Sequence, residues 1–180
     1  MAKNNIIETP AHPLFLFLFS DKRLSWLWLI IRVYIGWQWL VAGWEKVINP
    51  VWVGDKAGVA ISGFLNGTLL KTGGAHPSVA DWYANFIKMV ALPNAGIFSY
   101  MVSFGELFVG VALILGAFTG IAAFFGALMN VNYLLAGTLS INPQMLVLQF
   151  FLILAWRTAG WLGLDRFMPS LIKFSLNKNK

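Results

Sequence analysis

The stretch Ser99–Gly120, SYMVSFGELFVGVALILGAFTG, decides how this chain folds. It is long enough to cross a bilayer, because a helix of about 20 apolar residues spans a hydrocarbon core of about 30 Å. One carboxylate, Glu106, lies near its middle, and a charge at that depth is costly unless it faces the interior of a bundle and has a partner. Small residues at Ala112, Gly116 and Gly120 favour close packing of a second helix. We therefore expect a bundle of membrane helices built around Glu106.

The composition of the whole chain supports this interpretation. Its 180 residues are 58% hydrophobic and 11% charged, whereas soluble domains are about 45–50% apolar and about 25% charged. The net charge of +6 is spread over helix ends and loops, which favours a membrane surface over nucleic acid as the partner. Cysteine is absent and the only histidines are His12 and His76. We therefore expect no metal site and no heme held by this chain alone.

Apolar segments and turn residues predict an all-α fold, an integral membrane antiparallel four-helix bundle. The expected spanning helices cover residues 24–48, 95–117, 121–137 and 143–164. Pro143 suits the first turn of the last helix, and a tight turn around Phe118–Gly120 joins the second helix to the third. The expected regions are an N-terminal interfacial tail, the bundle and a basic tail, at residues 1–23, 24–167 and 168–180.

A long insertion, residues 49–95, separates the first two expected spans. Two weakly amphipathic pieces in it, 58–70 and 78–90, are too short to span, so we expect short helices that form a lid on the outer membrane face. Ser78 followed by Asp81 resembles a capping box for the second piece. Lysine and arginine concentrate near the two chain ends, so the positive-inside rule predicts a multi-pass protein of the cell membrane with both termini cytoplasmic.

Each expected spanning helix carries a strongly polar residue. Counting about 1.5 Å per residue places Arg32 about 12 Å from the inner end of its helix and Glu106 about 15 Å from the outer end, so we expect a buried ion pair near the midplane. Asn130, Gln149 and Arg157 are expected beside this pair. Two arginines against one carboxylate make a positive zone that suits an anion or a quinone carbonyl. The alternative is that these residues only join helices by hydrogen bonds.

The segment Gly105–Asn130, GELFVGVALILGAFTGIAAFFGALMN, resembles the signature of the DoxX/DoxD family of membrane proteins. Arg32, the run Gly43–Lys46 and Asn49–Pro50 resemble the first helix of that family. Asn142, Gln149 and the ending at residues 160–165 resemble its last helix. The resemblance covers residues 24–167.

This family includes the DoxD-type subunit of thiosulfate:quinone oxidoreductase, so the resemblance implies a quinone-coupled redox role, with thiosulfate or a related sulfur compound oxidised at the outer face. Arg32 and Arg157 are then expected to polarise a quinone oxygen, and Glu106 to relay the proton. Further contacts to the quinone or its anionic donor are expected from Asn130, Gln149, Trp44 and Lys46. The quinone is the expected redox carrier, with no metal.

Two other functions remain open on the sequence. The chain is also consistent with a non-catalytic membrane subunit that docks a second redox subunit, and with a small-anion transporter, although it has no inverted repeat. The electron donor, the quinone type and the oligomeric state, including a homo-oligomer, stay undecided. So does the question of whether Glu106 relays protons or only neutralises an arginine.

Overall fold

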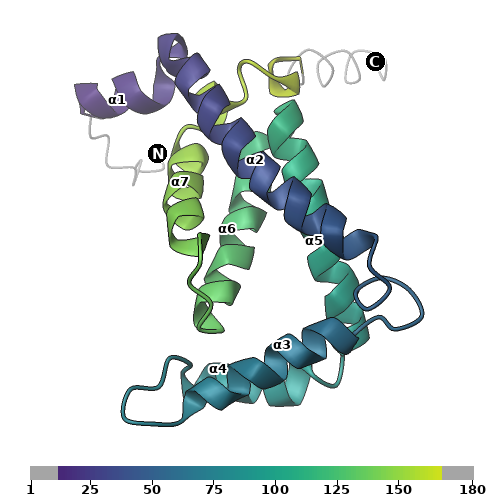
Figure 1. The fold of residues 1–180 in the computed structure, drawn as a ribbon. Helices are drawn as coiled ribbons and strands as arrows, with labels where there is room; N and C mark the ends of the chain where they lie inside the picture. The colour runs from purple at the N-terminus through teal and green to yellow at the C-terminus, as the bar shows by residue number, and fades with distance from the viewer. Residues whose placement is uncertain (1–11, 168–180) are drawn as a thin grey trace, which may run out of the picture.

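The computed structural model describes residues 12–167, and these residues form helices and connecting turns with no strand among them (Figure 1). The all-α fold class is confirmed. Two helices, α2 (Ser25–Val47) and α5 (Ala95–Leu115), are long and apolar enough to cross a membrane. The expected basic tail, 168–180, and residues 1–11 of the expected N-terminal tail lie outside the described residues.

Helices α2 and α5 pack tightly against each other in antiparallel directions. Gly43 faces the backbone of Leu107, and Gly110 faces the backbone of Leu40. Because a glycine has no side chain, the two backbones approach closely at these points. Gly36 faces Ile114 in the same way, so the small residues that make this contact are Gly36, Gly43 and Gly110, whereas Gly116 has a different role at the end of α5.

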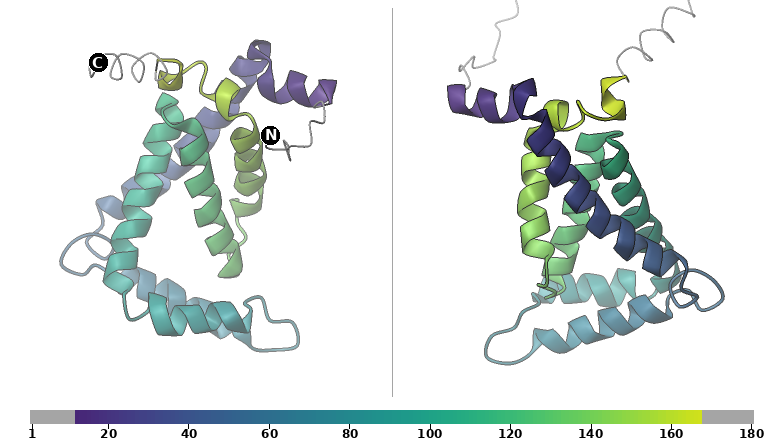
Figure 2. Two further views of the ribbon diagram at one scale, coloured as in Figure 1. Left: turned by 180° about the vertical axis from the view of Figure 1, so that it is seen from behind. Right: turned by 45° about the horizontal axis from the view of Figure 1, so that its top comes forward.

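Helix α5 ends at Gly116, whose left-handed conformation (φ 67°, ψ 44°) suits glycine. After a short turn α6 (Thr119–Leu135) begins, so the tight turn expected near residues 118–120 is confirmed and begins slightly earlier in the chain. From this turn α5 and α6 diverge, and seen from behind they form an inverted V (Figure 2).

Helix α7 (Asn142–Leu154) packs along α6 and carries Pro143 in its first turn, as expected. The expected continuous helix 143–164 is wrong, because the backbone of Ala155 (φ −89°, ψ 16°) departs from the helical conformation. A short helix α8 (Trp156–Ala159) and the 3₁₀ turn η4 (Leu164–Arg166) follow.

The first and last described elements lie at the same end of the molecule. Helix α1 (Pro13–Ser20) runs across this end and is joined to α2 by the 3₁₀ turn η1 (Lys22–Leu24) (Figure 1). Helix α8 and η4 lie there as well (Figures 1 and 2). We refer to this end as the terminal end.

The insertion forms a layer across the opposite end of the molecule (Figures 1 and 2). Its helices are α3 (Val59–Leu69) with the 3₁₀ turn η2 (Leu70–Thr72), and α4 (Asp81–Phe86) with the π-helical turn η3 (Ile87–Ala91). Both short helices expected in the insertion are thus present. We call residues 59–91 the α3–α4 layer.

The capping box expected at Ser78 is wrong. Helix α4 begins at Asp81 after Ala80, and no side chain caps its first turn. The backbone N–H of Ser78 instead donates to the carbonyl of Lys71 at 3.1 Å. Ser78 therefore belongs to the loop that joins the two helices of the layer.

Candidate functional site

The carboxylate of Glu106 is held by two side chains that come from two other helices. Lys46 Nζ donates to Glu106 Oε2 at 2.6 Å, and only 1% of the Glu106 side chain is exposed, against 19% for Lys46. The Tyr133 hydroxyl donates to Glu106 Oε1 in a short hydrogen bond. Both oxygens of the buried carboxylate therefore have partners. We call Lys46, Glu106 and Tyr133 the Glu106 cluster.

The packing of α2 on α5 brings this cluster together. Because Gly43 contacts the backbone at Leu107, the last turn of α2 meets the middle of α5. Lys46 lies in that last turn, and its Nζ also donates to the carbonyl of Ala42 at 3.3 Å. A cation at this position interacts favourably with the negative end of the helix dipole.

A cavity of about 990 Å³ lies beside the cluster, between α2, α5 and α6 on one side and the α3–α4 layer on the other. Trp39 stacks on Tyr133 with ring centroids 6.4 Å apart, and Phe64 meets the same ring edge-on at 6.1 Å. These rings fix the position of the Tyr133 phenol. The cavity wall also includes other aromatic side chains, namely Trp52, Tyr83, Phe86 and Phe98.

The cavity is open between α5 and α6. Its lining includes side chains from the facing sides of these diverging helices that are 47–65% exposed. They are Phe108, Phe118, Ile121, Phe125 and Leu128. The opening is therefore apolar, while the Glu106 cluster supplies charge deeper in the wall.

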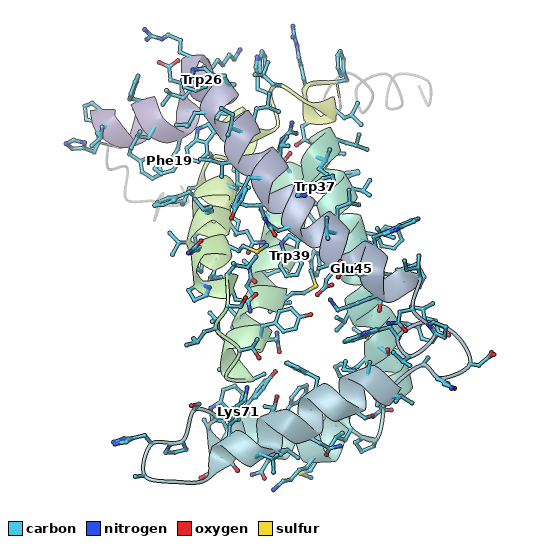
Figure 3. All side chains as sticks on the ribbon, viewed as in Figure 1. Phe19, Trp26, Trp37, Trp39, Glu45 and Lys71 are labelled. Carbon is cyan, nitrogen blue, oxygen red and sulfur yellow. The ribbon has the colours of Figure 1, made fainter. Side chains whose placement is uncertain are left out.

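The α3–α4 layer is fastened to α6 by two side chains. Lys71 Nζ donates to the carbonyls of Gly137 at 2.9 Å and Ala136 at 3.3 Å, at the lower end of α6 in Figure 3. The Tyr83 hydroxyl donates to the carbonyl of Asn132 at 3.1 Å. These bonds satisfy carbonyls at the end of α6 and close the floor of the cavity.

The expected ion pair between Arg32 and Glu106 is wrong. Arg32 is 1% exposed, and its Nη2 donates to the carbonyl of Leu162 at 3.1 Å near the terminal end. Arg32 and Lys46 are about four turns apart on α2, or roughly 20 Å, so an arginine at the first position cannot reach the carboxylate that Lys46 contacts. The depth estimate failed because the first turns of α5 extend past the end of α2.

Asp165 joins the end of the described chain to the turn between α5 and α6. Its carboxylate accepts hydrogen bonds from the backbone N–H groups of Phe118 at 2.6 Å and Thr119 at 2.9 Å. Its own N–H donates to the carbonyl of Gly116 at 2.8 Å. The N-cap residue of α6 is Phe118, which has no capping side chain, and the Asp165 carboxylate caps this helix end from a distant position in the sequence.

We expect Asp165→Ala to lower the free energy of unfolding by about 1–2 kcal/mol, since the first N–H groups of α6 lose their charged acceptor. Thermal unfolding in detergent micelles measures the effect. Asp55→Ala is the matched control, because Asp55 is exposed in a loop. Equal shifts in the two variants would contradict the capping role.

The other residues predicted for the site lie away from the cluster. Arg157 is exposed in α8, with its guanidinium 5.0 Å from the centre of the Trp156 ring at the terminal end. Trp44 is 57% exposed on α2 and does not line the cavity. Of the seven residues predicted from the sequence, only Glu106 and Lys46 belong to the Glu106 cluster.

Asn130 and Gln149 form a separate buried pair that joins α6 to α7. Asn130 Nδ2 donates to Gln149 Oε1 at 2.6 Å, and both residues are 0% exposed. Gln149 Nε2 and Trp39 Nε1 lie next to Gly126 and have no hydrogen-bond partner among the described residues. This pair lies behind the cavity wall that Trp39 helps to form.

Tyr133 and Trp52 are the important cavity residues that the sequence did not indicate. A usable signal existed for Tyr133, because it follows Asn130 by three residues and therefore lies on the same face of its helix. Trp52 follows the end of α2, and Lys46 Nζ lies 5.3 Å from the centre of its ring. No sequence periodicity marks Trp52, because it lies in a loop.

Comparison with known proteins gives one match. A family model described as DoxX matches residues 27–139, which is more than half of the 180-residue chain. The matched stretch contains all three residues of the Glu106 cluster and ends before α7. Searches of curated proteins and of solved structures returned no match.

Proposed function

The chain belongs to the DoxX family of membrane proteins, and from this premise we propose that it transfers electrons from a small donor to a lipid-borne quinone at the Glu106 cluster. The observation that carries the proposal is an apolar cavity that opens between two helices and has a buried ionic cluster in its wall. Thiosulfate or a related sulfur compound is the proposed donor.

In this proposal α2, α5, α6 and α7 form an antiparallel four-helix bundle across the membrane. Helix α6 has 17 residues, which gives a length of about 25 Å, close to a hydrocarbon core of about 30 Å. The α3–α4 layer is the outer lid, and the terminal end is cytoplasmic. The large exposed side chains of α5 and α6 that do not line the cavity suit contact with lipid, as Leu115 and Phe124 illustrate at 51% and 55% exposure.

The cavity fits a quinone in size, shape and chemistry. Its volume of about 990 Å³ lies at the upper end of small-molecule pockets, which measure about 300–1,000 Å³. Flat aromatic side chains favour a flat ring between them. Lys46 presents an N–H donor at the wall, where a quinone oxygen needs one, and Tyr133 lies beside it with its hydroxyl donated to Glu106. The opening between α5 and α6 leaves an apolar path for the tail of such a molecule.

The redox balance needs no further cofactor in the proposed reaction. Two thiosulfate ions joined as tetrathionate release two electrons, and a quinone takes up two electrons and two protons to become a quinol. The residues of this chain supply orientation and protons. Lys46 Nζ donates to Glu106 and to the carbonyl of Ala42, and its third N–H is left to donate to the ligand oxygen. The one proton of the Tyr133 hydroxyl is donated to Glu106, so Glu106 links Tyr133 to Lys46 and a proton can pass between them. Lys46 is partly exposed and exchanges protons with water.

The donor is expected at the rim of the cavity near the α3–α4 layer. Polar lining residues gather there, from the end of α6 and the loop before α7. They are Asn132, Thr138, Ser140 and Asn142. Lys71 lies beside them, bound to the carbonyls of Ala136 and Gly137. A cation at a polar rim attracts an anionic donor from the outer aqueous phase.

We expect Glu106→Gln to reduce donor-dependent quinone reduction by about 100-fold or more, because the amide cannot pass a proton between Lys46 and Tyr133. The assay follows the absorbance of a short-chain ubiquinone analogue with purified protein in nanodiscs and a panel of sulfur donors. Glu45→Gln is the matched control on the exposed side of α2 (Figure 3).

Two outcomes would contradict this proposal. Wild-type rates in the Glu106→Gln variant would remove the proton-relay role. A wild-type protein that reduces quinone with none of the donors would favour a non-catalytic subunit instead.

That second candidate function has an observation of its own. The α3–α4 layer exposes large apolar side chains, among them Leu70 at 86%, Met89 at 77% and Trp82 at 61%. An apolar surface of this kind suits docking of a second redox subunit. Affinity purification from native membranes tests this candidate, which predicts a co-purifying protein with its own redox cofactor.

A further inference from the structure

Two cations share one indole ring at the terminal end. Lys22 Nζ lies 3.8 Å from the centre of the Trp161 ring, and Arg166 Cζ lies 5.3 Å from it. Lys22 precedes α2 and Arg166 belongs to η4, so residues from opposite ends of the chain meet at this ring. Cation–π contacts hold both charges in place without neutralising them.

No carboxylate in the described range 12–167 neutralises Lys22 or Arg166 by an ion pair. The two carboxylates near them are engaged elsewhere. Asp21 pairs with Arg23 at 3.0 Å, and Asp165 caps α6. Hydrogen bonds and charge from Arg23 lower the pKa of Asp21 below its ordinary value, so this carboxylate remains committed to Arg23. Lys22 and Arg166 therefore place two positive charges at the Trp161 ring, and no carboxylate of the described residues is paired with them.

Exposed apolar side chains lie at the same end of the molecule as these charges (Figure 1). Helix α1 exposes Leu14, Phe15, Leu16 and Phe17 at 41–58%. On the other side Leu162 and Leu164 are 43% and 48% exposed. A hollow of about 360 Å³ lies beside Trp161 and Arg166 and is otherwise lined mainly by apolar residues. The site therefore offers cationic groups and apolar contacts together.

We propose that Lys22, Trp161 and Arg166 form a binding site for the headgroup of an acidic phospholipid. The phosphate oxygens accept hydrogen bonds from Arg166 and Lys22, and the acyl chains pack on the apolar side chains of α1 and residues 162–164. A soluble phosphate ion satisfies only the cations, so the apolar surroundings favour a lipid. This proposal does not depend on the quinone reaction.

Such a site favours the orientation in which the terminal end faces the leaflet that contains acidic lipid. Acidic lipids attract lysine and arginine side chains near the membrane surface. The α3–α4 layer has exposed lysines too, at Lys56 and Lys88, but neither of them lies over an aromatic ring among the described contacts. We therefore expect selectivity for acidic lipid at the terminal end and not at the layer.

Titration of short-chain phosphatidylglycerol into purified protein in an uncharged detergent tests the proposal. The double variant Lys22→Gln/Arg166→Gln is expected to bind roughly tenfold more weakly than the wild type. The double variant Lys56→Gln/Lys88→Gln removes the same charge from exposed positions and is expected to change binding by less than about twofold. Trp161→Leu keeps both cations and is expected to weaken binding several-fold.

Two further ligands separate the sources of the phosphate group. Short-chain phosphatidylcholine has the same tails and no net charge, and it is expected to bind more weakly than phosphatidylglycerol. Inorganic phosphate that binds as tightly as phosphatidylglycerol would overturn the lipid proposal in favour of a soluble anion. Equal losses in the two double variants would also overturn it, because the attraction would then be unspecific. All four proteins are compared only after their unfolding midpoints agree.

Discussion

Replacement of Lys46 by Met is expected to lower the free energy of unfolding by about 3 kcal/mol, because it leaves a buried carboxylate without its cation. Glu106 is 1% exposed, so water cannot replace the lost ammonium group. Tyr133 retains its hydrogen bond to the other oxygen, but a phenol does not neutralise the charge. Titration with a denaturing detergent in mixed micelles measures the change.

The double variant Lys46→Met/Glu106→Gln distinguishes this mechanism from simple loss of packing. An amide carries no charge, so most of the lost stability is expected to return when the second substitution is added. Lys56→Met is the control for the lysine, because Lys56 is exposed, and it is expected to change stability by less than about 0.5 kcal/mol. A double variant that is less stable than Lys46→Met would contradict the ion pair.

Gly110→Ala is expected to cost about 3 kcal/mol or more, although it adds a single methyl group. A Cβ at Gly110 would overlap the backbone of Leu40 and the carbonyl of Gly36. Backbone atoms cannot rotate aside, so α2 and α5 must separate. The unfolding midpoint measured by intrinsic fluorescence reports the loss of stability.

Gly96→Ala is the matched control on the same helix. A Cβ at Gly96 meets no atom within 4 Å, and alanine favours a helix over glycine by roughly 0.5–1 kcal/mol. The control is therefore expected to be neutral or slightly stabilising. Similar losses in Gly96→Ala and Gly110→Ala would show that the close contact between α2 and α5 is not a main source of stability.

Most of the helical organisation could be predicted from the sequence, because it depends on local properties. Long apolar runs indicate α2 and α5, and Gly116 marks the turn between α5 and α6. The end of α7 at Ala155 could not be predicted, because the apolar sequence continues through that position while the backbone there leaves the helical conformation. Ser78 failed as a cap because α4 begins only at Asp81, after Ala80, while Ser78 is held in the preceding loop by its N–H bond to the carbonyl of Lys71, a contact that the sequence pattern does not contain.

The sequence predicted a buried carboxylate with a cationic partner, but it did not predict which residues surround that carboxylate. The cost of a buried charge correctly required a cationic partner for Glu106. Its identity depends on the register between α2 and α5, which the contacts of Gly43 and Gly110 determine. Counting residues along one helix gives depth relative to its own ends only. Tyr133 was not predicted, because a tyrosine in an apolar helix indicates packing. The sequence does not show that its hydroxyl donates to Glu106.

The turn that Asp165 caps is also the point from which α5 and α6 diverge. The α5 arm has 21 residues and the α6 arm 17, or about 31 Å and about 25 Å, so a rotation of about 5° at this pivot moves the far end of an arm by about 2–3 Å. The two arms frame the apolar opening of the cavity. Asp165 holds this turn through two backbone N–H groups, so a change in these contacts would alter the angle between α5 and α6 and with it the width of the apolar opening.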